Sequence, residues 1–146
     1  MGILSILIFF PLLGAVGALA VRKAEAAKWV ALVTSIVTFV ISAVVYLQFN
    51  PSGTGYQLVE QVPWVVTQSL SFTYFVGLDG MSMMLVLLTT FLMIITIIGT
   101  WNSISKSVPA FMALLMVLET GMLGVFASLD LFLFYVLWEV ILIPMY

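Results

Sequence analysis

The chain contains no cysteine and no histidine among its 146 residues. It therefore lacks the thiolate and imidazole ligands of most zinc sites, of iron–sulfur clusters and of His-ligated haem, and we expect it to bind no metal. The same absences exclude a cysteine nucleophile and any catalytic triad that contains histidine.

Charge is also scarce, since only 7% of the residues are charged whereas 64% are hydrophobic. A soluble domain carries about 25% charged residues, so this composition predicts an integral membrane protein in contact with the lipid bilayer. The net charge is −2, with only four basic residues, which argues against nucleic acid as a partner.

Five long apolar segments predict an all-α, multi-pass fold of about five transmembrane helices in one membrane domain, residues 1–146. The first segment is no signal peptide, because Arg22 and Lys23 follow it. With Lys28 and Lys106 they place the first and third connections in the cytoplasm by the positive-inside rule, so the N-terminus lies outside. The expected helices are 3–21, 28–49, 80–101, 108–128 and 130–146, with a long outer loop over 50–78 between the second and third.

The outer loop is the one long polar segment. Residues 57–62 and 69–76 alternate partly and are rich in β-formers, a pattern compatible with a short hairpin. Glu60, inside this segment, is interpreted as a solvated loop charge. Asp79 precedes the third helix, where we expect its carboxylate to cap the free N–H groups.

Glu139 lies in an almost wholly apolar run, 130–146, and has no cation nearby in sequence. At 1.5 Å per residue it lies about 13 Å beyond Asp130, roughly halfway across a ~30 Å hydrocarbon layer. An ionisable residue at such a depth usually faces the bundle interior or a wet cavity and marks an ion or proton path. A protonated, hydrogen-bonded structural glutamate is the alternative. We favour a proton-translocation role for Glu139.

Glu119 is a second candidate for proton translocation, and a structural glutamate is the alternative for it as well. It precedes Asp130 by eleven residues and Glu139 follows Asp130 by nine, so on antiparallel helices their depths differ by about 3 Å. Gly121 and Gly124 predict tight helix contact nearby. Helix rotation, and hence whether the two glutamates face each other, is open at this point. If they were close, both could ionise only with a cation between them, and no Lys or Arg of the chain lies at that depth.

The fifth apolar segment has about 16 residues after Asp130, or about 24 Å, which is less than the ~30 Å span. Pro144 interrupts it, and no polar residue marks its far end. We therefore expect the C-terminus at Tyr146 to be a truncation within the last helix.

Several motifs resemble one protein family over the whole chain. They are Asp-Gly-Met-Ser at 79–82, Glu-Thr-Gly-Met-Leu-Gly-Val-Phe at 119–126, and above all Asp-Leu-Phe-Leu-Phe-Tyr-Val-Leu-Trp-Glu at 130–139 followed by Leu-Ile-Pro-Met at 142–145. The chain is similar to the antiporter-like membrane subunits of proton-translocating NADH:quinone oxidoreductase, respiratory complex I. Within them it most resembles the N-terminal portion of subunit M, also called chain 4.

The resemblance implies a membrane-arm subunit of an electron-transport translocase in the respiratory chain. NADH, FMN, iron–sulfur clusters and quinone would be bound by partner subunits, so the resemblance implies no catalytic residue, no cofactor and no redox chemistry within this chain. Neighbouring antiporter-like subunits would be further partners. In the family, the glutamate that matches Glu139 pairs with a lysine on a later helix and drives proton movement. That lysine and the family's broken helices lie beyond residue 146, so this mechanism is implied for the whole subunit alone.

Two other functions stay open. The same fifth-helix glutamate would serve a multisubunit cation/proton antiporter or a membrane-bound hydrogenase complex, and a short helical protein could also be a non-transporting structural subunit. We favour the bacterial plasma membrane as the location.

Overall fold

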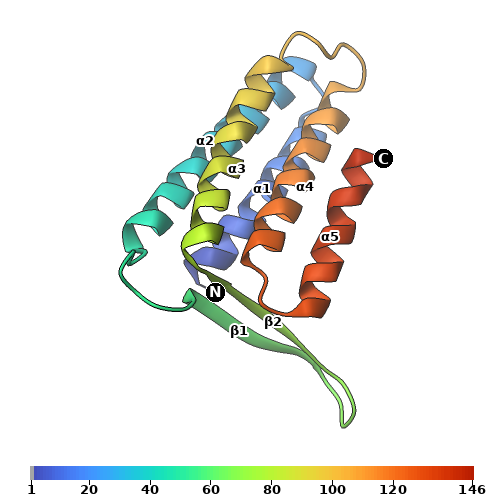
Figure 1. Ribbon diagram of the computed structural model, residues 1–146. Helices are drawn as coiled ribbons and strands as arrows, with labels where there is room; N and C mark the ends of the chain where they lie inside the picture. The colour runs from blue at the N-terminus through green and yellow to red at the C-terminus, as the bar shows by residue number, and fades with distance from the viewer. Residues whose placement is uncertain (1) are drawn as a thin grey trace.

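The computed structural model describes residues 2–146, which form five α-helices and one two-stranded sheet (Figure 1). Four helices are long and apolar enough to cross a membrane, and the fifth is a shorter apolar helix. The predicted fold class, an all-α integral membrane protein, is confirmed, with a hairpin added in the loop between the second and third helices. The elements are α1 (Ile3–Val21), α2 (Ala24–Gln48), β1 (Gln57–Val66), β2 (Ser71–Leu78), α3 (Gly80–Gly99), α4 (Val108–Ala127) and α5 (Leu131–Met145).

Helix α2 begins at Ala24, four residues before its predicted start at Lys28. Alanines at 24, 26 and 27 favour the helical state, and Glu25 in the first turn suits the positive end of the helix dipole. The Lys28 Nζ lies 3.5 Å from the Glu25 Oε1, an i,i+3 pair that supports this turn. The prediction set the start too late because it took charged residues to lie outside the helix. Helix α3 likewise ends at Gly99, before the predicted 101.

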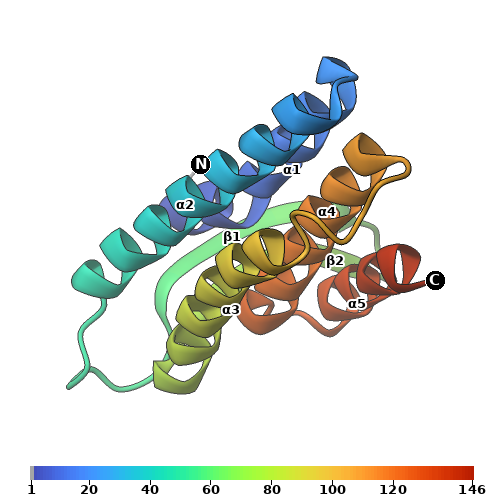
Figure 2. The same cartoon turned by 90° about the horizontal axis from the view of Figure 1, so that it is seen from above.

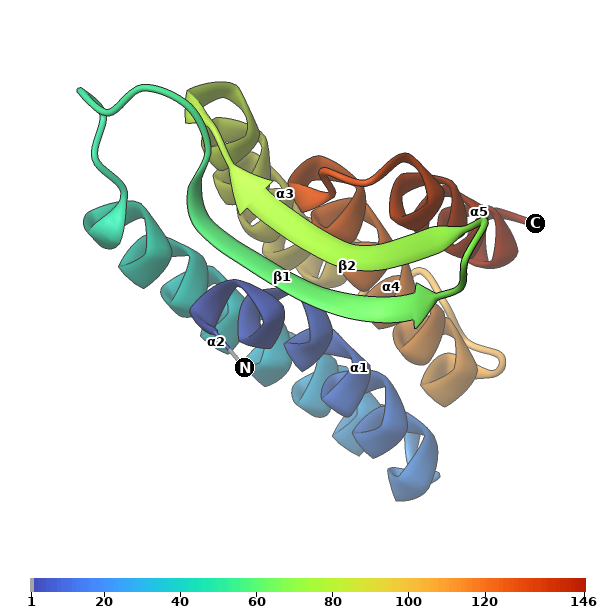
Figure 3. The ribbon, with the colours of Figure 1, turned by 90° about the horizontal axis from the view of Figure 1, so that it is seen from below.

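The outer segment forms the hairpin that its alternation allowed. Strands β1 and β2 pair antiparallel, with Val66 opposite Ser71 beside the turn. Figure 3 shows the hairpin crossing one end of the bundle, under α1, α4 and α5. Its β2 strand also holds the α4–α5 connection, since the Leu129 N–H donates to the Phe75 carbonyl over 2.8 Å. We call this end of the bundle the outer end.

Glu60 is not a solvated loop charge, and that prediction was wrong. Its carboxylate accepts hydrogen bonds from the Gly2 N–H at 2.7 Å, the Ser5 N–H at 2.8 Å and the Ser5 hydroxyl at 2.8 Å. The first N–H groups of a helix have no partner within the helix and attract negative charge. Glu60 therefore caps α1 from a strand that lies 55 or more residues later in the chain.

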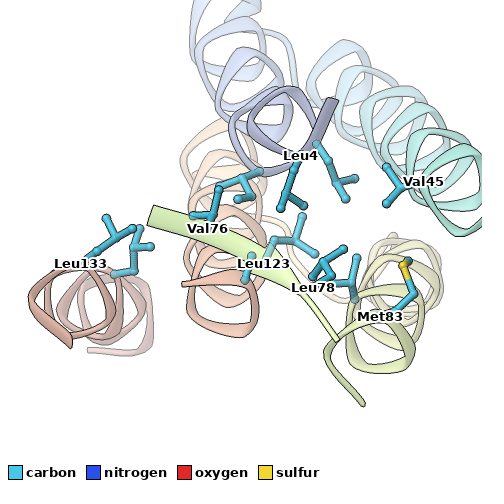
Figure 4. Packing of buried hydrophobic residues seen from close by; sticks show 12 residues of the cluster. Leu4, Val45, Val76, Leu78, Met83, Leu123 and Leu133 are labelled. Atoms are coloured by element: carbon cyan, nitrogen blue, oxygen red, sulfur yellow. The ribbon is translucent and has the colours of Figure 1, made fainter. Parts of the chain in front are cut away.

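Helix α4 is the central helix, because α1, α2, α3 and α5 all pack against it (Figure 2). The buried apolar residues around it form two separate clusters. The outer cluster lies beside the hairpin and is drawn from α1 to α5 and β2 (Figure 4); it comprises Leu4, Leu7, Ile8, Val45, Val76, Leu78, Met83, Val86, Leu123, Ala127, Leu133 and Leu137. The inner cluster lies toward the other end and comprises Ala15, Ala18, Ala27, Ala31, Met93, Ile97, Val108, Met112, Ala113 and Met116.

Candidate functional site

A layer of buried polar side chains separates the two clusters. Along α4, Glu119 and Thr120 lie between Met116 of the inner cluster and Leu123 of the outer cluster. Helices α2 and α3 likewise carry buried polar side chains between the residues that they contribute to the inner cluster and those that they contribute to the outer cluster. We call this set the polar layer; its members are Thr34, Ser35, Thr38, Ser42, Thr89, Thr90, Glu119 and Thr120, all buried.

The hydroxyl groups that α2 and α3 contribute to the polar layer are mostly bound to their own helices. The Ser35 hydroxyl donates to the Ala31 carbonyl at 2.9 Å, and the Thr38 hydroxyl to the Thr34 carbonyl at 2.8 Å. One contact joins the two helices, because the Ser42 and Thr90 hydroxyls lie 3.0 Å apart. Such bonds satisfy each hydroxyl proton inside an apolar bundle and leave oxygen lone pairs as acceptors.

The close approach of α1 to the polar layer depends on Gly14. A Cβ built at Gly14 would lie 2.5 Å from the Thr34 Cγ2 and 2.7 Å from its Oγ1. Those distances are far inside van der Waals contact, so a side chain at position 14 would push α1 away from α2. Small residues permit such approach between membrane helices, and here they close one side of the polar layer.

Glu119 is the chemically unusual member of the layer. Its side chain is fully buried, and within residues 2–146 neither carboxyl oxygen has a hydrogen-bond partner. The adjacent Thr120 hydroxyl likewise has none in this part of the chain. Buried polar groups without partners are rare and costly in folded proteins, and an intramembrane carboxyl group is by default a functional candidate. The structure therefore presents Glu119 as a group available for a proton or for water.

Glu139 has the opposite environment, because it lies on the exposed face of α5. The buried face of α5 is marked by Leu137 and Ile141, which meet α4 at Gly124 and Gly121 respectively. Glu139 is two residues from each of them, or about 200° around the helix, and so it points away from α4. The tight α4–α5 contact that the two glycines predicted is therefore present, but it does not involve the glutamate of α5.

The two candidate glutamates do not face each other. On α4 the side toward α5 is the glycine side, and Glu119 precedes Gly121 by two residues, which turns it toward the opposite side. Their similar depth, which follows from the short α4–α5 connection, does not bring the carboxyl groups together. Shared ionisation between them therefore does not arise in this structure. Nor does any group of three or more acidic side chains gather at a possible metal site within residues 2–146.

The sequence carried a signal for the polar layer that our prediction missed. Thr34, Thr38 and Ser42 are spaced by four residues, which places their hydroxyls along one face of α2. In an otherwise apolar helix, such a stripe indicates the side that packs against other helices. Glu119 was identified as a candidate, but its complete burial in the same layer was not predicted.

A second polar contact lies at the outer end. The Ser5 hydroxyl, which donates to Glu60, lies 2.8 Å from the Tyr74 hydroxyl on β2. Partial burial raises the pKa of Tyr74 above its usual value, and the negative charge of Glu60 raises it further, against the effect of the Ser5 hydrogen bond. The phenol therefore keeps its proton at physiological pH and holds β2 to the start of α1.

No family model matches the chain. It is 40% identical over 150 residues to NADH-quinone oxidoreductase subunit M of Rhodobacter capsulatus, which covers 99% of this chain and 28% of that protein. It is 36% identical to NAD(P)H-quinone oxidoreductase chain 4 of Prochlorococcus marinus, over 98% of this chain and 27% of that protein. It is 34% identical to subunit M of Rickettsia conorii, over 99% of this chain and 30% of that protein. The chain thus spans less than a third of the length of these relatives, and the resemblance seen in the motifs is confirmed.

Proposed function

Because nearly the whole chain is homologous to the N-terminal portion of NADH-quinone oxidoreductase subunit M, we propose that it serves in a membrane-arm subunit of that complex. The subunit contributes to proton translocation coupled to electron transfer from NADH to quinone. The observation that carries the proposal is the match over 99% of the chain to relatives of that name.

In this proposal Glu139 is the working proton site. It is a carboxyl group near mid-membrane on the face of α5 that α4 leaves uncovered. A carboxylate exposed to hydrocarbon would be very costly, so its stable environment is a protein element or a wet cavity against that face. The family resemblance supplies a lysine on a later helix as the partner. Glu139 then holds or releases its proton according to the charge of that partner.

Glu119 has a supporting role in the proposal. It lies on the other side of α4 from Glu139, among the hydroxyls of the polar layer, with unsatisfied oxygens. It could exchange a proton with water that enters this layer. Since it does not face α5, its contribution is separate from that of Glu139.

The redox groups belong to partner subunits in this proposal. NADH, FMN, iron–sulfur clusters and quinone are bound there, and other membrane-arm subunits, including antiporter-like ones, contact this chain. The chain is an integral membrane protein, and we propose the bacterial plasma membrane as its location, with the N-terminus outside, as the basic connections indicate.

The main rival is a cation/proton antiporter or hydrogenase subunit without NADH oxidation. The names of the relatives favour the quinone oxidoreductase. Purification of the full-length protein through an affinity tag distinguishes the two, because we expect flavin, iron–sulfur clusters and NADH:quinone activity to co-purify. Their absence from an intact, transport-competent complex would favour the antiporter.

The role of Glu139 is tested by proton pumping of the assembled complex in proteoliposomes, with NADH oxidation followed in parallel. Gln at position 139 preserves shape and hydrogen bonding but does not titrate, so we expect Glu139→Gln to lose most proton pumping and the turnover coupled to it. Glu119→Gln should have a smaller effect. Gln68→Glu, the reverse exchange at an exposed position of the hairpin turn, is the matched control. Normal pumping by an assembled Glu139→Gln complex would reject the proposed site.

A further inference from the structure

All four basic residues of the chain lie at the end of the bundle opposite the hairpin. Arg22 and Lys23 form the α1–α2 connection, Lys28 lies in the first turns of α2, and Lys106 lies in the α3–α4 connection. Figure 1 shows both connections at the same end of the molecule. We call this end the basic end. Three of its side chains, those of Arg22, Lys23 and Lys106, are exposed.

An aromatic pair joins the two connections. The rings of Trp29 and Trp101 meet edge to face, with centroids 5.2 Å apart, and the Lys28 Nζ lies 5.7 Å from the centre of the Trp101 ring. Lys28 is buried and is also paired with Glu25. Its charge is therefore matched inside the protein. Tryptophans in such a position are typical of the depth at which lipid headgroups lie.

The three exposed cations have no such match. Within residues 2–146 none of them makes an ion pair, and the single carboxylate of the basic end, Glu25, is engaged by Lys28. The basic end therefore has an excess of positive charge that the described chain does not neutralise.

The outer end shows how differently the chain treats charge elsewhere. Three carboxylates lie there, and each accepts hydrogen bonds at a helix start: Glu60 at α1, Asp79 at α3 and Asp130 at α5. The carboxylates at the outer end thus bind N–H groups of the protein itself, whereas the three exposed cations at the basic end make no ion pair within residues 2–146. This contrast indicates a partner of opposite charge at the level of the Trp29–Trp101 pair.

We propose that the basic end is a binding site for the phosphate groups of anionic phospholipids. Arg22, Lys23 and Lys106 contact the headgroup phosphate, and the Trp29–Trp101 pair contacts the glycerol and the upper acyl chain. Basic side chains that lie beside a transmembrane helix attract anionic lipid, and aromatic rings at the interface hold the apolar part. The site is independent of the proton-translocation role of Glu139 and Glu119, which lie far from this end.

The test uses the assembled complex purified from membranes, with retained phospholipids counted by mass spectrometry. The triple variant Arg22→Gln, Lys23→Gln, Lys106→Gln should lose anionic phospholipid that the wild type retains. After delipidation, the phosphatidylglycerol concentration for half-maximal rebinding should rise by tenfold or more. The charge-conserving variant Arg22→Lys, Lys23→Arg, Lys106→Arg should behave as the wild type. Equal retention and rebinding by the Gln variant would overturn the proposal.

Two further experiments separate lipid recognition from non-specific anion binding and from altered membrane orientation. Phosphatidylcholine and inorganic phosphate, each in place of phosphatidylglycerol, should rebind or compete poorly; equal competition by inorganic phosphate would show an adventitious anion site and overturn lipid recognition. Labelling of Ser103→Cys with an impermeant maleimide, read out by mass spectrometry of the peptide that contains residue 103, reports whether the Gln variant keeps its membrane orientation. If that variant fails to assemble, a photoactivatable phosphatidylglycerol added to the wild type should crosslink within 22–29 or 101–107, and crosslinks elsewhere alone would reject the site.

Discussion

The outer and inner halves of the bundle are built from different side chains. The outer cluster consists mainly of Leu, Ile and Val, whereas half of the inner cluster is alanine and most of the rest is methionine. Only the outer half has a hairpin that ties helix ends together in the described chain. Lipid is as apolar as either cluster, so helix association in membranes depends on packing. Large interlocking side chains therefore stabilise the outer half, whereas close approach of the helices stabilises the inner half.

The two halves should be destabilised by opposite changes in side-chain size. We expect the largest loss of stability when a large buried side chain of the outer half is shortened. Leu123 on α4 is fully buried there, and Leu123→Ala should lower the stability of the bundle by about 2–5 kcal/mol through lost contacts and a cavity. Thermal inactivation and yield of the assembled complex measure this. Leu92→Ala on α3 is the control, because Leu92 is exposed on the bundle surface. Equal effects of the two variants would contradict the distinction between core and lipid-facing leucines.

The inner half should instead be sensitive to enlargement. Ala31 on α2 is fully buried in the inner cluster, and Ala31→Leu should cost about 1–3 kcal/mol because the helices must move apart to admit the side chain. Val33→Leu, an enlargement at an exposed position of α2, is the matched control. The same thermal assay applies. If Ala31→Leu were as stable as the control, close helix approach would not be what holds this half.

The hairpin contribution to the outer half is tested at Glu60. Glu60→Gln removes the charge that three donors at the start of α1 share, and we expect a local loss of about 1–2 kcal/mol. Amide hydrogen exchange at residues 3–6 should then quicken by roughly tenfold, since 1.4 kcal/mol is a factor of ten. Exchange at the start of α2, in the inner half, should stay as in the wild type. Unchanged exchange at α1 would show that the cap contributes nothing.

The smallest expected effect is a pH dependence at the start of α3. The Ser82 N–H donates to Asp79 over 2.8 Å, and this bond is the main cause that lowers the pKa of Asp79 below its usual value. A lowered pKa means that the folded state favours the carboxylate. Its stabilisation is therefore complete above the ordinary pKa of about 4 and is lost as the pH falls through the folded-state value. We expect about 1 kcal/mol or less, because the group is largely solvated.

Comparison with Asp79→Asn at each pH isolates this effect. The variant keeps a hydrogen-bond acceptor but has no titrating group at that position. Amide exchange at 82–84 should therefore differ between wild type and variant near neutral pH. The difference should shrink as the pH falls below about 4, the ordinary pKa of the group, and vanish once Asp79 is protonated in the folded state as well. A difference that persists in acid would have another origin.

The sequence predicted the helix bounds well, but it indicated helix rotation only where small residues mark a contact, as at Gly121 and Gly124 of α4. Long apolar runs set the bounds, and α1 forms over the predicted 3–21. These helices are apolar on nearly every face, however, because lipid and protein interior select the same side chains. The distribution of apolar residues therefore did not indicate which of Glu119 and Glu139 would be enclosed. The role of Glu60 could not be predicted either, because its partners Ser5 and Gly2 precede it by 55 and 58 residues and no local sequence pattern identifies them.

The capping of α1 by Glu60 has a consequence for biogenesis. During synthesis α1 leaves the ribosome first, while the carboxylate that completes its N-terminal turn is still to be translated. Glu60 lies in the hairpin, which follows α2 in the chain, so its carboxylate can reach the start of α1 only after α2 has been made. The first turn of α1 thus stays open until the hairpin docks. Docking of the hairpin therefore completes the N-terminal turn of α1 only after the first two helices have been made.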